Sequence, residues 1–145
     1  MTEAHDDNVP TLLVAIDGSQ TSLRAGAYAA GMARRQNARI VCLFVHTIGV
    51  FTGLGAETVR SQLETQNAIA QELRKTAETE GARLGIDATF VERKGNPYTE
   101  IVRLADEIRA DAVIVGASSQ AGHRFVGSLA THLVRDARWP VTVVP

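Results

Sequence analysis

The chain has 145 residues, the usual length of a single domain. Apolar residues make up 45% of it and charged residues 21%, which is typical of globular proteins and excludes a disordered or fibrous chain. The formal net charge of −1 at pH 7 argues against the strongly basic surfaces that broad binding to nucleic acid or anionic membranes requires. We therefore expect one compact domain, with no nucleic-acid partner and no membrane partner.

Residues 1–9 are predicted to be a disordered lead-in to a domain that covers residues 10–145. The opening MTEAHDDNVP is polar and acidic, so it lacks the apolar segment of a secretory signal. No apolar stretch approaches the length that spans a membrane. The single cysteine, Cys42, lies in the apolar run RIVCLFV, which favours a buried, unreactive thiol. These features predict a cytoplasmic protein.

The first half of the domain is predicted to contain two buried strands and two helices. TLLVAID (11–17) is a continuous apolar run, as expected of a strand covered on both faces. After it, Ser19 or Thr21 is suited to cap a helix. The predicted inner face of that helix consists of Leu23, Ala27, Ala30 and Ala33. ARIVCLFVH (38–46) predicts the second strand. An amphipathic pattern predicts a long helix over 57–83 that ends at Gly81 or Gly85, and its predicted inner face consists of Val59, Leu63, Ala70, Leu73 and Ala77.

The second half is predicted to add three strands, at residues 86–93, 111–117 and 140–145. Two helices lie between them. Asn96 is suited to cap the first, with Pro97 in the first helical position, and the second covers 127–137. Strands that are mostly continuous apolar runs and that alternate with helices indicate a parallel sheet covered on both faces. The predicted fold class is therefore a doubly wound α/β sandwich.

Ligands in doubly wound folds bind outside the carboxyl ends of the strands, where the winding direction reverses. This rule places the candidate site at the ends of the first, second and fourth strands, with the loops that follow them. Asp17 ends the first strand and is followed by Gly18. Its carboxylate is suited either to contact a ligand or to close an Asx-turn at the strand-to-helix corner. Both interpretations stay open.

The segment VGASSQAGHRFVGSLA (115–130) has the glycine spacing of a phosphate-binding loop but lacks the lysine before its final serine. Gly116 permits a close approach to the backbone, while Gly127 and Ser128 open a helix whose free N–H groups favour an anion. Further donors or cations in the segment are Ser118, Ser119, His123 and Arg124. The segment is therefore either a phosphate cradle or a solvated connection before an ordinary helix start.

No general base, nucleophile or paired carboxylate is visible around these strand ends. The Gly-x-Ser-x-Gly elbow of hydrolases and the GxGxxG pattern of dinucleotide-binding folds are missing. His46 and His123 have no spaced cysteine or carboxylate to complete a metal set. We therefore expect no catalytic residues and no protein metal site, although slow nucleotide hydrolysis stays open.

Three separated segments carry a resemblance to a known family. They are LLVAIDGSQTS, GNPYTEIVRLADEIRADAVIVGAS and GSLATHLVRDARWPVTVVP. With these segments in this order, residues 10–145 resemble a universal stress protein domain of the single-domain bacterial type. The resemblance implies a five-stranded parallel sheet with strand order 3-2-1-4-5, the adenine nucleotide alpha hydrolase-like fold. It also implies a homodimer formed along the fifth strand.

In the nucleotide-binding members of that family, ATP lies in the cleft located above, and Mg²⁺ is a possible companion. The resemblance implies that Asp17 meets the adenosine moiety, that backbone at Ala15 and Val45 flanks adenine, and that Gly127 and Ser128 hold the phosphates. The full set of predicted nucleotide-binding residues is Ala15, Ile16, Asp17, Val45, Val115, Gly116, Ser118, Ser119, Gly127, Ser128 and Leu129.

The phosphate-binding segment departs from the family's pattern, which is a Gly, two residues, a second Gly, nine residues, then Gly and Ser or Thr. Gly116 and Gly127-Ser128 fit its ends, but Ser119 stands at the second Gly and only residues 120–126 follow. A loop two residues shorter moves its amides by several ångströms, at about 3.5 Å per residue. Contacts to adenine and ribose should therefore survive better than contacts to phosphate.

The residues and the resemblance together predict a stress-response sensor or regulator, rather than an enzyme, that binds ATP or a related adenine nucleotide such as AMP or cyclic AMP. The alternative is a member of the family that binds no nucleotide and acts through dimerisation and protein contacts. In that case the loop over residues 46–57 and the C-terminal edge matter most. Trp139 then either anchors the dimer seam or packs within its own chain.

Overall fold

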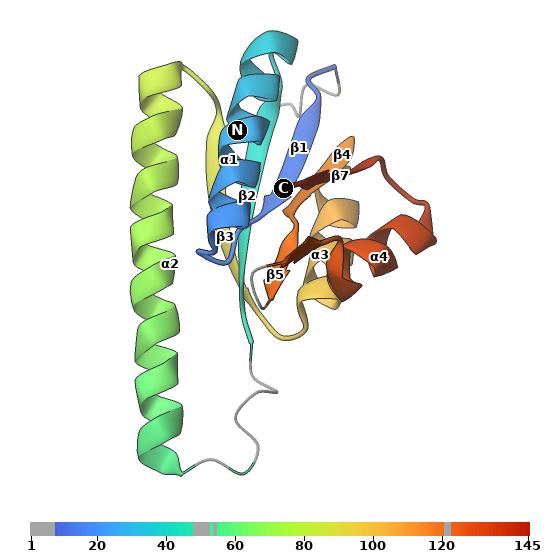
Figure 1. Ribbon diagram of the computed structural model, residues 1–145. Coiled ribbons are helices and arrows are strands. Elements are labelled where there is room, and N and C mark those ends of the chain that lie inside the picture. The colour runs from blue at the N-terminus through green and yellow to red at the C-terminus, as the bar shows by residue number, and fades with distance from the viewer. Residues whose placement is uncertain (1–7, 48–52, 54, 121–122) are drawn as a thin grey trace.

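Five parallel strands form one sheet, and helices cover both of its faces (Figure 1). The computed structural model describes residues 8–47, 53, 55–120 and 123–145. The strands of the sheet are β1 (Thr11–Ala15), β2 (Arg39–His46), β3 (Ala88–Lys94), β4 (Ala112–Gly116) and β7 (Val141–Val144). Their spatial order is β3-β2-β1-β4-β7, which confirms the predicted order 3-2-1-4-5 because β7 is the fifth of these strands along the chain.

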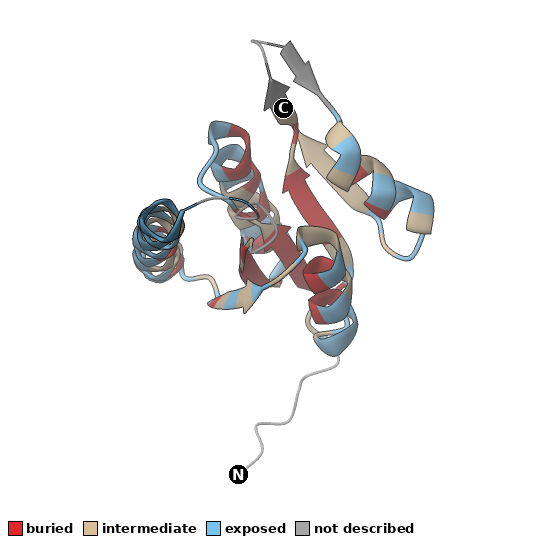
Figure 2. Ribbon diagram, turned by 90° about the horizontal axis from the view of Figure 1, so that it is seen from below, coloured by how far each residue is buried: buried red, intermediate tan, exposed pale blue. Residues whose placement is uncertain are grey.

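The four helices lie in two layers. They are α1 (Gln20–Gln36), α2 (Ala56–Leu84), α3 (Pro97–Glu107) and α4 (Gly127–Asp136). Successive side chains of β1 enter two different buried clusters, one on each face of the sheet. Leu12 and Val14 pack with residues of α1 and α2, and Leu13 packs with residues of α3 and α4. The buried residues run through the middle of the sheet, between these layers (Figure 2). This double burial explains why β1 is a continuous apolar run rather than an alternating one.

The inner face of α1 differs from the predicted one. Ser19 caps the helix as expected, and its side chain accepts a hydrogen bond from the Ser22 N–H. Leu23, however, is 46% exposed. Ala33 is buried as predicted, but the other buried residues of the helix are Thr21, Ser22, Ala25 and Ala29. Both stripes have helical spacing, so periodicity could not choose between them. The close approach of α1 to β4 favours the stripe of small side chains.

The long helix α2 has few buried residues, which are Ala70, Leu73 and Gly81. Ala70 and Leu73 are buried as predicted, whereas Leu63, predicted on the same face, is 41% exposed. The N-terminal half of α2 reaches beyond the ends of the strands, so that part has no sheet to pack against (Figure 1). Gly85 ends the helix in a left-handed conformation, with φ at +66°. No helix in the described ranges is long and apolar enough to cross a membrane.

A short antiparallel hairpin follows β4 and was not predicted from the sequence. It consists of β5 (Ser118–Gln120) and β6 (His123–Phe125), which pair as a separate two-stranded sheet. Strands of three residues are too short to show a pattern that distinguishes them from a loop. Both strands of the hairpin therefore lie within the segment that was predicted to be either a phosphate cradle or a plain connection.

Several other predictions have definite outcomes. Cys42 is buried as expected, and its burial raises the pKa of the thiol to about 11, so it stays protonated and unreactive near neutral pH. Asn96 caps α3, where its side chain accepts from the Thr99 N–H, and Pro97 is in the first turn. Residues 1–7 of the predicted lead-in over 1–9, and residues 48–52 and 54 of the loop expected between β2 and α2, lie outside the described residues.

Candidate functional site

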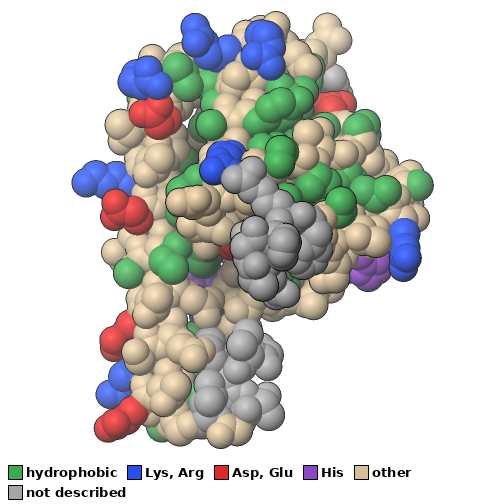
Figure 3. Space-filling view, in the orientation of Figure 1, with side chains coloured by type: hydrophobic (Ala, Val, Ile, Leu, Met, Phe, Trp, Pro, Cys, Tyr) green, Lys and Arg blue, Asp and Glu red, His purple; other side chains and the backbone are tan. Residues whose placement is uncertain are grey.

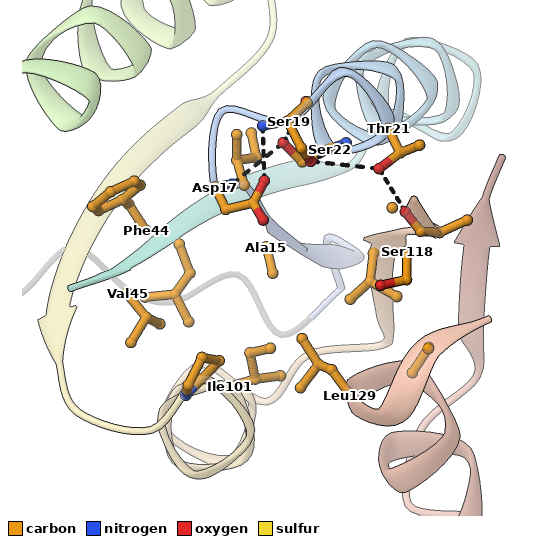
Figure 4. A pocket seen from close by; sticks show the side chains of 18 of the residues that line it. Ala15, Asp17, Ser19, Thr21, Ser22, Phe44, Val45, Ile101, Ser118 and Leu129 are labelled. Carbon is orange, nitrogen blue, oxygen red and sulfur yellow. Dashed lines mark hydrogen bonds between the residues drawn. The ribbon is translucent and has the colours of Figure 1, made fainter. Parts of the chain in front are cut away.

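A cleft of about 790 Å³ opens at the carboxyl ends of β1, β2 and β4 (Figure 4). This volume lies in the range of small-molecule binding sites. Its walls come from the first turn of α1, the ends of the three strands, one side of α2 and α3, and the start of α4. The position agrees with the rule for doubly wound sheets, because the winding direction reverses beside β1, which pairs with both β2 and β4.

The cleft brings together almost every residue that the sequence nominated. Those that line it are Ala15, Ile16, Asp17, Val45, Val115, Gly116, Ser118, Gly127, Ser128 and Leu129. Ser119 lies in β5, and its side chain is outside the described part of the structure. His46 is not among the lining residues and pairs instead with Glu92, through Nε2 and Oε1 at 2.9 Å. What these residues bind remains a prediction.

Asp17 closes the Asx-turn that was one of its two interpretations. Its Oδ1 accepts a hydrogen bond of 2.8 Å from the Ser19 N–H, and its own N–H donates to Ser22 Oγ at 3.3 Å. Gly18 lies between them with φ at +90°, a conformation that disfavours other residues. The Asp17 side chain is nevertheless exposed at the lip of the cleft. The turn and a ligand contact are therefore compatible.

Two opposing effects act on the Asp17 carboxyl. Partial burial raises its pKa, but hydrogen bonds from Ser19 and Ser22 lower the pKa further, so the net pKa lies below the ordinary value of 3.8. A carboxyl group whose pKa is lowered in the folded state stabilises that state above the pKa of the unfolded chain. This stabilisation is lost as the pH falls through the folded-state value.

We expect Asp17→Ala to lower the free energy of unfolding at pH 7 by about 1 kcal/mol, because the turn loses its acceptor. This deficit should shrink as the pH falls below 3.8, where the wild-type carboxyl also becomes protonated. Urea unfolding followed by circular dichroism between pH 7 and pH 3 measures it. Asp17→Asn, which keeps an oxygen acceptor, is the control and should lose less. A deficit equally large at pH 3 would contradict this role for the charge.

Position 116 requires a glycine because of a close contact that the sequence did not predict. A Cβ atom there would lie 2.5 Å from the carbonyl carbon of Thr21 and 2.6 Å from the nitrogen of Ser22. The group that approaches its backbone is therefore the first turn of α1, rather than a ligand. Thr21 Oγ1 also donates a hydrogen bond of 2.6 Å to the Ala117 carbonyl. Gly116 thus sets the distance between two walls of the cleft.

Gly127 is the second constrained glycine in the cleft. Its φ is +82°, and a Cβ atom there would lie 2.8 Å from the Cβ of Ser118. The preceding residue, Val126, makes no side-chain capping hydrogen bond to α4. The N–H groups at the start of α4 are thus not capped by that side chain, which leaves donors for an anion or for water beside Gly127 and Ser128.

The part of the cleft beside β2 and α3 is mainly apolar, with side chains of Val45 and Ile101 around it, and Leu129 adds an apolar side chain from α4 (Figure 4). Gln66 of α2 fixes the neighbouring end of β2. Its Oε1 accepts from the Thr47 N–H at 3.0 Å, and its Nε2 donates to the Thr47 carbonyl at 3.4 Å. No sequence signal singled out Gln66, because a glutamine on a long amphipathic helix usually faces water.

The described lining residues contain two charged side chains, Asp17 and Arg24. No sequence signal singled out Arg24 either, since positive charge was expected at His123 and Arg124, whose side chains lie outside the described part of the chain. Across the described ranges, no group of three or more His, Cys, Asp or Glu side chains is arranged to hold a metal ion.

Comparisons with known proteins place this architecture in a family. The family described as "Universal stress protein family" matches residues 9–145. A universal stress protein of Methanocaldococcus jannaschii is 30% identical over 92% of this chain and 80% of its own length. A universal stress protein solved in complex with cAMP is 26% identical, with a TM-score of 0.71 over 94% of this chain and 97% of the other.

A further solved structure, a universal stress protein family protein of Arabidopsis thaliana with AMP bound, has a TM-score of 0.68 and 18% identity. It covers 93% of this chain and 90% of its own, and it supports the fold alone. The family match spans nearly the whole chain, and the relatives cover it at similar length. The chain therefore belongs to the universal stress protein family.

Proposed function

We propose that this chain binds an adenine nucleotide, ATP or a close relative, in the cleft and acts as a cytoplasmic stress-response sensor or regulator rather than as an enzyme. One observation carries the proposal. Residues nominated from separated parts of the sequence, including Asp17, Val45 and Gly127, line a single cleft of about 790 Å³. The two ends of that cleft differ in character as the two ends of a nucleotide do.

The apolar part of the cleft suits the base. Val45, Ile101 and Leu129 offer surfaces on which a flat ring can pack, while strand-end backbone groups supply hydrogen bonds. Asp17 at the lip suits a ribose hydroxyl, because an ionised carboxylate accepts hydrogen bonds. The relative solved in complex with cAMP supports an adenine nucleotide in general.

The start of α4 suits the phosphates. Gly127 and Ser128 line the cleft there, and the helix N-terminus favours negative charge. Mg²⁺ would accompany ATP mainly through the phosphates and water, since Asp17 is the one carboxylate among the described lining residues. The same scarcity of acid and base groups supports binding rather than rapid turnover.

Calorimetric titration of protein freed of bound nucleotide tests the proposal directly. Mg-ATP, AMP and cyclic AMP are titrated separately, and we expect saturable binding of at least one, with a stoichiometry near one per chain. Mg-GTP is the matched control, because it shares the phosphates and differs in the base, and it should bind more weakly. No saturable heat with any of the three adenine nucleotides would overturn the proposal.

We also propose a homodimer along β7. This strand is at one edge of the sheet, with β4 as its neighbour, and its residues are only partly buried. Hydrophobic side chains gather on the face that carries α1 and the C-terminal strand (Figure 3). Trp139 packs against the buried cluster of the α3 and α4 layer, with the Arg138 guanidinium 4.6 Å from its ring centroid. This favours packing within its own chain, and light scattering measures the oligomeric state.

A further inference from the structure

We propose that Arg24 contacts the phosphates of the bound nucleotide. It thereby gives the cleft a higher affinity for adenine nucleotides with several phosphates than for adenosine or AMP. The inference rests on the proposed function and deepens it. Arg24 is exposed, lines the cleft, and is the one cation among the described lining residues. Its role is to bind and to set specificity.

The other polar side chains of the first turn of α1 are already used by the fold. Ser19 caps the helix and Ser22 Oγ donates to the Ser19 carbonyl at 2.8 Å. Thr21 Oγ1 donates to the Ala117 carbonyl. Gln20 and Arg24 are both exposed and both line the cleft. They are four residues apart, so they lie on the same side of the helix.

The surroundings of Arg24 favour an anion. Helix α1 contains no Asp or Glu, so Arg24 has no acidic neighbour within its own helix. The positive end of the α1 dipole faces the same cleft, and so does the start of α4 at Gly127. Against these, Asp17 is the one described negative side chain in the lining. A ligand with several negative charges balances this field best.

Arg24 also supplies phosphate contacts in place of those that the short phosphate-binding segment is not expected to make. That segment is two residues shorter than the family's pattern, and it contains the paired strands β5 and β6. The position of Arg24 is set by the Ser19 cap and by the packing of α1 on β4, which do not depend on the length of that segment. A guanidinium with several donors reaches phosphate oxygens from a distance that backbone amides cannot span.

The test compares the wild type with Arg24→Gln by calorimetric titration of adenosine, AMP and Mg-ATP. We expect Arg24→Gln to weaken Mg-ATP binding about tenfold, to weaken AMP binding less, and to leave adenosine binding unchanged. The affinity for Mg-ATP should also depend less steeply on salt in the variant. Arg35→Gln, an exposed cation on the same helix that does not line the cleft, is the matched control.

The outcomes separate the two proposals. Equal Mg-ATP affinity in the wild type and Arg24→Gln overturns the role of Arg24 and leaves the proposed function standing. No binding of any adenine ligand to the wild type overturns the proposed function, and the role of Arg24 with it. A loss of adenosine affinity as large as the loss of Mg-ATP affinity overturns the phosphate assignment. Arg24→Lys, which keeps the charge without the planar fork, should restore part of the Mg-ATP affinity.

Discussion

Replacing Gly116 by alanine is expected to lower the free energy of unfolding by about 3 kcal/mol, at the upper end of the usual cost of overpacking. The added Cβ would lie 2.5 to 2.8 Å from backbone atoms of Thr21 and Ser22. Backbone cannot rotate away as a side chain can, so α1 must move off β4. Thermal and urea unfolding, each followed by circular dichroism, measure the change.

Gly31→Ala is the matched control on α1. A Cβ atom there would meet the end of the flexible Arg35 side chain at 3.2 Å, which can move aside at little cost. Because alanine favours a helix over glycine, this variant should be as stable as the wild type or slightly more stable. If Gly116→Ala unfolded at the same urea concentration as the wild type, the close contact between β4 and α1 would not be essential.

Gly127→Ala is expected to weaken Mg-ATP binding at least tenfold, the largest effect we anticipate on the proposed site. The change has two costs: φ at +82° disfavours a side chain, and the new Cβ would lie 2.8 Å from the Cβ of Ser118. Relief requires the start of α4 or the hairpin to shift, and both border the cleft. Calorimetric titration gives the affinity, and unfolding curves should show a loss of about 1 to 2 kcal/mol.

Gly85→Ala separates backbone strain from the change at the cleft. Gly85 also has a positive φ, at +66°, but a Cβ atom there would meet nothing within 4 Å, and the residue caps the far end of α2. This variant should lose a similar amount of stability to strain and keep its affinity for Mg-ATP. An equal loss of affinity in Gly85→Ala and Gly127→Ala would show that binding follows overall stability and not the geometry at Gly127.

These two variants change different walls of the cleft. Gly116→Ala acts through the wall between α1 and β4, whereas Gly127→Ala acts where α4 begins. If the phosphates lie between these walls, as we propose, both changes should reduce affinity for Mg-ATP more than affinity for adenosine. Asp17→Ala, at the lip beside the proposed ribose position, should reduce the affinity for both.

Much of the fold was predictable because a strand that is buried on both faces has a continuous apolar sequence. The strands β1, β2, β4 and β7 are apolar runs, and the helices between them follow local rules that need no tertiary information. Asn96 begins a helix where the sequence placed it, and Ser19 and Gly85 were each one of two candidates that the sequence offered. Parallel strands joined by helices leave few topologies, so the order of the elements alone is enough to locate a site at the strand ends.

Other features depend on which atoms meet across the chain, and local patterns carry no record of them. The inner face of α1 could not be chosen between two stripes of equal spacing, because the choice depends on how closely the helix approaches β4. The hairpin after β4 consists of strands too short to show a period. Gln66 and Arg24 looked like ordinary surface side chains until the fold placed them on the cleft.

The sequence by itself determined the doubly wound fold class and the edge of the sheet for a candidate site, since these follow from burial patterns and local caps. The family and the order of the strands came from the resemblance of three segments to universal stress proteins. Only the tertiary structure showed that Gly116 makes room for α1 rather than for a ligand, and that Arg24 lies in the same cleft as Gly127. The physical reason is that a contact between distant segments depends on distances of a few ångströms, which no single segment encodes.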